Sequence, residues 1–106
     1  MLFRSLHKTS HNAFTTTNLA QHLTSRGVGD LLVTGIRTEQ CCETTARVAS
    51  DLGYQVRFVV DATATHPLAL WDGSGALTAA EVVERTASAL QGRFADVVTV
   101  DDVLSS

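Results

Sequence analysis

The sequence predicts an α/β fold, with a mostly parallel sheet between two layers of helices. One pattern occurs three times: an amphipathic helix, a glycine suited to a helix end, and a short β-branched run. Two of these runs, residues 31–33 and 58–60, are apolar without alternation, which indicates strands buried on both faces. Alternating helices and strands with right-handed crossovers form such three-layer α/β/α sheets.

The first helix and strand are expected at residues 17–26 and 31–34. Leu19 and Leu23 lie one turn apart on one face of this helix, and Gly27 follows its end. The spacing therefore predicts a short amphipathic helix that leads into a buried strand.

The second helix is expected at residues 41–52. Gly53 marks its end, and a strand should follow at residues 55–60. Helical spacing places four side chains on one face, namely Thr45, Val48, Ala49 and Leu52.

The third helix begins after a capping box, in which Thr78 is followed three residues later by Glu81. Its buried face is expected to carry Val82, Val83, Thr86 and Leu90. The helix should stop at Gly92, before a strand at residues 96–100.

The remaining segments lack helical or strand periodicity, apart from the apolar residues 1–3, which are expected to end an earlier strand. A polar turn follows at residues 7–12. Residues 63–75 contain the only proline and the only tryptophan, and we expect them to form a loop over the sheet. Residues 1–106 should form one domain.

The composition argues against several classes of protein. Eight basic and eleven acidic residues give a net charge of -3, and no basic stripe is available for nucleic acid. The apolar runs are too short to span a membrane, and the N-terminus lacks the apolar core of a signal peptide. The two cysteines are adjacent and should be free thiols, so we expect a soluble, cytoplasmic protein.

The strand-to-helix turn before Cys41 is the most informative stretch of the sequence. A thiol in a first helical turn lies near unpaired N–H groups and the positive end of the helix dipole, which favour the thiolate and could hold an oxyanion. Both cysteines could instead be small apolar side chains that pack the helix onto the sheet. Helical spacing places Cys42 with Ala46 and Ala49 toward the sheet, which leaves Cys41 nearer the cleft.

Residues 33–42 read VTGIRTEQCC, and they are followed in register by TTAR at 44–47, GY at 53–54 and VDA at 60–62. This ordered set resembles the signature of the isochorismatase-like cysteine hydrolases, which include nicotinamidases and carbamoylsarcosine amidases. The resemblance implies a truncated, Rossmann-like version of that family's fold, equivalent to its C-terminal part.

The resemblance also implies the catalytic roles. The family's nucleophile is the cysteine of Gly-Ile-x-Thr-x-x-Cys, which falls on Cys41. A non-proline cis peptide before this turn maps to Ile36 and Arg37, and it would turn the N–H groups of Arg37 and Cys41 toward the oxyanion. A lysine at fixed spacing before Ala-Phe maps to Lys8, although the family often has serine where Asn12 stands. Without the resemblance, Lys8 would read as an ordinary solvated lysine.

The family's third catalytic residue is an aspartate in an N-terminal segment that this sequence does not contain. The chain is therefore expected to be an incomplete domain that lacks its proton acceptor. Asp61 and His11 are candidate substitute bases, and Glu39 lies in a suitable turn, although the family aspartate that matches Asp61 is mainly structural. The four histidines show no ligand spacing, so neither a metal nor another cofactor is expected.

The expected function is hydrolysis of a small amide, ureide or related carbonyl compound. The alternative is a truncated, non-catalytic relative that forms a homo-oligomer or is completed by an N-terminal polypeptide. A thiol redox sensor is a third reading, less favoured because the sequence has no Cys-x-x-Cys pair. The loop residues that could roof the pocket are His66, Pro67, Leu70 and Trp71.

Overall fold

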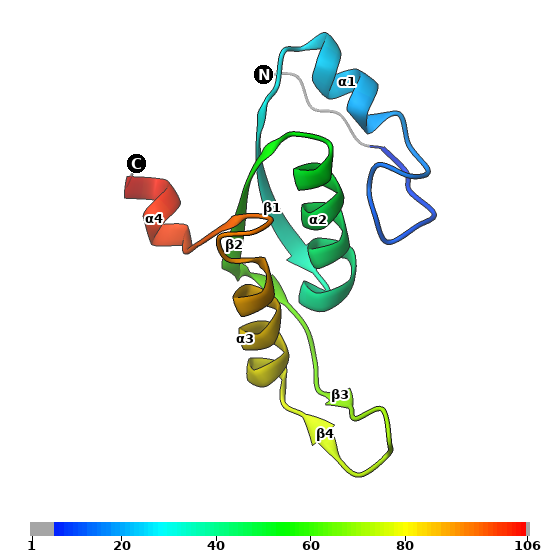
Figure 1. The fold of residues 1–106 in the computed structure, drawn as a ribbon, viewed down its shortest axis with the longest axis vertical. Coiled ribbons are helices and arrows are strands. Elements are labelled where there is room, and N and C mark those ends of the chain that lie inside the picture. Colours follow the sequence, from blue (N-terminus) through cyan, green and yellow to red (C-terminus); the bar gives the residue numbers. More distant parts are fainter. Residues whose placement is uncertain (1–5, 106) are drawn as a thin grey trace.

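The sheet of this α/β fold consists of three parallel strands. The computed structural model describes residues 6–105, so the strand end expected at residues 1–3 lies outside the described part. The strands β1 (Asp30–Ile36), β2 (Gln55–Ala64) and β5 (Asp96–Val98) lie in the order β1-β2-β5. The predicted fold class, with a mostly parallel sheet, is confirmed (Figure 1).

The helices α2 (Glu43–Asp51) and α3 (Ala79–Leu90) pack on one face of this sheet. Val33 pairs with Phe58, and Phe58 pairs with Val97, so apolar side chains form a continuous row across the three strands. The buried core that these elements share contains Val33, Cys42, Ala46, Ala49, Val56, Phe58, Leu90 and Ala95.

The opposite face of the sheet is only partly covered. Val59 is 3% exposed, and the helix α4 (Val100–Ser105) contacts β2 and lies across the sheet from α2 in Figure 1. Leu32 points to this second face, because neighbouring strand residues alternate, and it is 48% exposed. The expected burial of residues 31–33 on both faces is therefore wrong at Leu32, since no described element covers it.

The first helix is shorter than the expected 17–26. The helix α1 spans Leu19–Ser25, because the Thr17 hydroxyl accepts the N–H of Leu19 at 3.1 Å and donates to the carbonyl of Ala13. These two bonds hold Thr17 in a turn before the helix.

The strands also differ in length from the sequence prediction. β1 and β2 are longer than the expected 31–34 and 55–60, because their parallel pairing continues past an irregularity as far as Ile36 and Ala64. β5 ends at Val98 instead of residue 100, and α4 was not predicted. Its N-terminal turn is closed by Thr99, whose N–H donates to Asp102 Oδ2 at 2.9 Å and whose hydroxyl accepts the Asp102 N–H at 3.1 Å.

The helix expected at residues 41–52 is divided into two parts. The π-helical turn η1 (Thr38–Cys42) comes first and runs directly into α2. The face of α2 toward the core carries Ala46 and Ala49, whereas Leu52 lies after the helix and is 54% exposed. The capping box before α3 is present as predicted, with Thr78 and Glu81 each accepting the other's backbone N–H.

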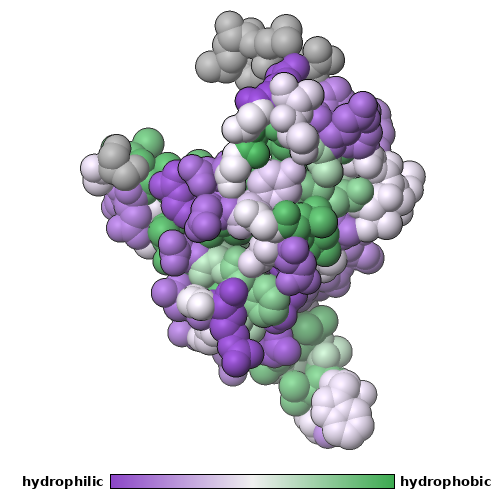
Figure 2. Space-filling view, turned by 45° about the horizontal axis from the view of Figure 1, so that its top comes forward, coloured by the Kyte–Doolittle hydropathy of each residue, from purple (hydrophilic) through white to green (hydrophobic). Residues whose placement is uncertain are grey.

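Residues 63–75 do not form a loop over the sheet. They include the end of β2 and the short strand β3 (Leu68–Ala69), which pairs antiparallel with β4 (Ala76–Leu77). The β3–β4 segment, residues 66–77, projects from the body as an arm with apolar side chains on it (Figures 1 and 2). Within residues 6–105, none of the helices combines the length and apolar character needed to cross a bilayer.

Candidate active site

The turn that carries Cys41, the candidate nucleophile, joins the end of β1 to α2 and is called the nucleophile turn below. Gly35 has a φ of 127°, a backbone conformation that favours glycine, and a side-chain Cβ there would make only ordinary contact with the Cys42 sulfur, at 3.7 Å. One residue further on, the peptide bond between Ile36 and Arg37 is cis. The Arg37 carbonyl accepts the N–H groups of Gln40 at 3.1 Å and Cys42 at 3.2 Å, which closes the turn.

The two adjacent thiols have different surroundings. Cys42 is 3% exposed in the core, whereas Cys41 is partly exposed. The pKa of the Cys42 thiol is raised to about 11, mainly by burial; the charges of Cys41 and Glu39 also raise it, and the charge of Lys8 lowers it. Helical spacing correctly predicted that Cys42 faces the sheet with Ala46 and Ala49.

Lys8 lies beside the more exposed thiol. Its Nζ is 3.4 Å from the Cys41 sulfur, although 33 residues separate the two in sequence. The same ammonium donates to the carbonyls of Ser10 at 2.9 Å and His11 at 3.3 Å. The lysine therefore bridges its own loop and the turn that carries Cys41.

The lysine loop packs against the body through aromatic rings. Phe14 stacks on Tyr54 with ring centroids 5.7 Å apart, and the N–H of Phe14 donates to Asn12 Oδ1 at 2.8 Å. Within the loop, the Thr16 hydroxyl accepts the N–H of Thr9 at 2.8 Å. These contacts keep residues 8–16 next to the helix that follows the two cysteines.

Glu39 anchors the other side of the turn, a role that local spacing did not reveal. Its carboxylate accepts hydrogen bonds from Arg37 Nη2 at 3.1 Å and from the Thr65 hydroxyl at 2.8 Å. Burial alone would raise the pKa of Glu39, but hydrogen bonds from its own N–H and from Thr65, together with the Arg37 charge, lower it. A carboxylate held in this way is a poor proton acceptor.

Two threonine hydroxyls form a further connection between the turn and β2. The buried Thr38 hydroxyl donates to Thr63 Oγ1 at 3.0 Å, and that hydroxyl donates to the carbonyl of Val60 at 2.8 Å. The turn is therefore fixed to the end of β2 by both Thr63 and Thr65.

An open hollow of about 320 Å³ exposes the Cys41–Lys8 pair to solvent. It is lined by Lys8, Thr9, Ser10, His11 and Cys41. Of the two candidate substitute bases, His11 lines this hollow and Asp61 does not. The Asp61 carboxylate accepts the N–H of Val100 at 2.8 Å, where it holds the start of α4.

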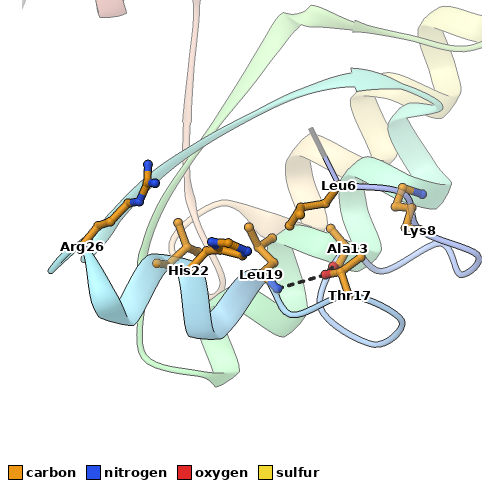
Figure 3. Close-up of a pocket in the computed structure, with 8 residues that line it drawn as sticks. Leu6, Lys8, Ala13, Thr17, Leu19, His22 and Arg26 are labelled. Carbon is orange, nitrogen blue, oxygen red and sulfur yellow. Dashed lines mark hydrogen bonds between the residues drawn. The ribbon is translucent and has the colours of Figure 1, made fainter. Parts of the chain in front are cut away.

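A second, mostly apolar pocket of about 270 Å³ lies beside the hollow (Figure 3). Lys8 belongs to both, and Figure 3 shows its amine pointing away from the apolar side chains. The lining residues are Leu6, Lys8, Ala13, Thr17, Leu19, His22, Leu23 and Arg26.

The expected roof over the thiol is wrong. His66, Pro67, Leu70 and Trp71 lie on the β3–β4 arm, and none of them lines the hollow. Trp71 is 96% exposed, so its side chain also does not anchor the arm by packing against the described residues. Among residues 6–105, no three histidine, cysteine or carboxylate side chains gather in a way that could hold a metal ion.

Comparison with known proteins finds a matching family model, related proteins and similar solved structures. A family model, the Isochorismatase domain, matches residues 4–102. Nicotinamidase 3 of Arabidopsis thaliana is 47% identical over 58 residues, which are 55% of this chain and 29% of that protein. An isochorismatase-family structure from Chromobacterium violaceum has a TM-score of 0.88 and 31% identity, covering 92% of this chain and 50% of that one.

A cysteine hydrolase from Pseudomonas syringae pv. phaseolicola has a TM-score of 0.84 and 32% identity, covering 92% of this chain and 46% of that one. The chain therefore spans about half the length of these structures, and less of the plant relative.

Proposed function

The chain belongs to the isochorismatase family, and on that premise we propose that it is a hydrolase that cleaves a small amide, ureide or related carbonyl substrate through Cys41. The observation that carries this proposal is the 3.4 Å approach of Lys8 Nζ to the Cys41 sulfur at the edge of an open hollow. A cation beside a partly exposed thiol favours the nucleophilic thiolate.

The reaction begins when the Cys41 thiolate attacks the carbonyl carbon. A C–S bond forms and the carbonyl oxygen takes the negative charge, which the N–H groups of Arg37 and Cys41 stabilise together with the Lys8 ammonium. The carbonyl then re-forms as the C–N bond breaks, and the nitrogen leaves with the proton that the acceptor took from the Cys41 thiol. Water hydrolyses the thioester, which releases the acid and restores the thiol.

His11 is the proton acceptor that we favour in this chain. His11 is exposed and lines the same hollow as Cys41, and an imidazole can accept a proton near neutral pH. Asp61 is the less suitable candidate, because its carboxylate accepts the Val100 N–H and lies outside the hollow.

The similar proteins support the substrate class and the nucleophile. Nicotinamidase 3 is named for an amide substrate, and the similar structure from Pseudomonas syringae is named a cysteine hydrolase. Both lend weight to a cysteine-dependent amidase. Because this chain spans about half of its structural relatives, the activity of the chain itself is the quantity to measure.

The experiment is an assay of ammonia release from a panel of small primary amides that includes nicotinamide. We expect Cys41→Ala to abolish release and Lys8→Met to lower it by about 10²-fold, a usual loss for a group that stabilises developing charge. Cys42→Ala is the matched control, because it removes the neighbouring thiol and should retain activity. Equal rates for the Cys41→Ala variant and the original chain would overturn the proposal.

A second candidate function is that of a non-catalytic subunit whose sheet is extended by another chain. Two observations favour it: β1 is the terminal strand of its sheet in the described residues, and Leu32 on that strand is 48% exposed. This reading predicts a homo-oligomer, or an assembly with an N-terminal polypeptide that supplies further strands, without ammonia release. Native mass measurement combined with the amide assay separates it from the first.

A further inference from the structure

Thr45 connects the nucleophile helix to the lysine loop. It lies on α2, four residues after Cys41, which places it about one helical turn further along. Its hydroxyl accepts the N–H of Ala13 at 3.1 Å and donates to the carbonyl of His11 at 3.4 Å. One side chain thus bonds to two backbone groups of the loop that carries Lys8.

The hydrogen bond from Thr45 to the His11 carbonyl is linked to the Lys8 ammonium through a shared acceptor. That oxygen also accepts a hydrogen bond from Lys8 Nζ at 3.3 Å, so the Thr45 hydroxyl and the Lys8 ammonium share one acceptor. A lysine side chain has a flexible four-carbon stem, and its position depends on the acceptors around its ammonium. Fixing the His11 carbonyl therefore fixes one of the acceptors that place Nζ next to the Cys41 sulfur.

The loop needs such an anchor close to the lysine. Another contact of the loop with the body is the stacking of Phe14 on Tyr54, beyond the C-terminal end of α2. Phe14 lies six residues along the chain from Lys8, and the bonds within the loop, such as that from the Thr9 N–H to the Thr16 hydroxyl, do not themselves join the lysine end to α2. The two bonds from Thr45 meet the loop at His11 and Ala13, nearer to the ammonium.

We propose that Thr45 is a positioning residue that clamps the lysine loop to the nucleophile helix and so holds the Lys8 ammonium at the Cys41 sulfur. The inference rests on the proposed function, in which Lys8 assists Cys41. It adds a residue that acts on the lysine through the His11 carbonyl, to which its hydroxyl donates.

The test compares variants that differ at the hydroxyl. Thr45→Val removes the donor and acceptor and keeps the β-branched shape, Thr45→Ala is a second hydroxyl-free variant with high helix propensity, and Thr45→Ser restores the hydroxyl. Thr44→Val is the matched control, because Thr44 has the same side chain about 100° away around the helix.

The measurement is the rate of Cys41 alkylation by iodoacetamide as a function of pH, with the adduct located by peptide mass spectrometry. We expect Thr45→Val and Thr45→Ala to slow alkylation at neutral pH by about tenfold and to move the profile to higher pH, as withdrawal of an opposite charge does. Thr45→Ser and Thr44→Val should behave like the original chain. In a Lys8→Met background, Thr45→Val should have no further effect.

Two outcomes would overturn the clamp: an unchanged profile for both hydroxyl-free variants, or a Thr45 effect of equal size in the Lys8→Met background. The proposed function is judged separately, by whether an activated ester acylates Cys41. A Thr45 effect on alkylation without acylation supports the clamp and refutes the hydrolase. Acylation with unchanged alkylation profiles refutes the clamp alone.

Discussion

Replacement of Thr65 by valine should loosen the nucleophile turn from the side opposite Lys8. The Thr65 hydroxyl donates to Glu39 Oε1 at 2.8 Å, and Arg37 Nη2 donates to the other carboxylate oxygen at 3.1 Å. The Glu39 side chain is only 10% exposed. Valine keeps the shape of threonine but leaves this nearly buried carboxylate short of one donor.

The magnitude follows from the charge and burial of the acceptor. Loss of a hydrogen bond to a charged group costs about 1.5–3 kcal/mol, and the low exposure of Glu39 lets little water replace the hydroxyl. We therefore expect Thr65→Val to lower the free energy of unfolding by about 2 kcal/mol at neutral pH. For a domain of this size, each 1 kcal/mol of that loss corresponds to roughly 4–8 °C in Tm.

The stability loss of Thr65→Val should change with pH in one direction. Because the folded-state pKa of Glu39 is lowered, its ionised form stabilises the fold above the usual carboxyl pKa of about 4, and this stabilisation is lost as the pH falls through the lowered value. Thr65 is one of the groups that lower this pKa. The difference between Thr65→Val and the original chain should therefore be largest at neutral pH and shrink in acid.

Urea denaturation at neutral pH and at a pH of about 3 measures both quantities, provided that both chains are folded there. Thr65→Ser is the control, because it keeps the hydroxyl. A loss below about 0.5 kcal/mol at neutral pH, the usual size for an uninvolved surface position, would show that the Thr65–Glu39 hydrogen bond does not stabilise the fold. A loss that grows as the pH falls would contradict the expected pH dependence.

Three further predictions concern the core and the arm. Burial raises the folded-state pKa of Cys42 to about 11, so the neutral thiol stabilises the fold fully below the unfolded-state pKa of about 8.5, and this stabilisation is lost as the pH rises toward 11. The original chain should therefore lose more stability in alkali than Cys42→Ala does, as measured by urea denaturation. Phe58→Ala should cost about 3–5 kcal/mol and abolish cooperative thermal unfolding, because Phe58 is 0% exposed; a loss under 1 kcal/mol would contradict the core assignment. Trp71 is 96% exposed, so iodide should quench its fluorescence nearly as well as that of free tryptophan in the monomeric chain, and a shielded, blue-shifted emission would contradict the projecting arm.

Local patterns predicted the elements that carry their own signals. The capping box of Thr78 and Glu81 marks the start of α3 because both groups lie within one helical turn. The burial of Cys42 with Ala46 and Ala49 follows from helical spacing and a small side-chain volume at each position. These features depend on neighbours within a few residues, which a single sequence displays directly.

Other features depend on contacts that local spacing does not encode. The two-residue strands β3 and β4 are too short to show a period, so residues 63–75 read as a loop. The exposure of Leu32 depends on what covers the sheet and not on the strand itself. The contact between Glu39 and Thr65 spans 26 residues, and neither residue shows it locally.

The candidate site was accessible mainly through family resemblance. Lys8 and Cys41 are 33 residues apart, and without the resemblance the lysine is one polar residue in a polar turn. The structure brings the two within 3.4 Å and also supplies the positions of His11 and Asp61, which separate the two candidate bases.

The most direct measurement is the site of acylation after brief exposure to an activated acyl ester at neutral pH, located by peptide mass spectrometry. We expect a hydroxylamine-sensitive thioester on Cys41 that forms more slowly in Lys8→Met and is absent in Cys41→Ala. A chain that remains unmodified at Cys41, or that acquires the acyl group only on Cys42 or on amines, would contradict it.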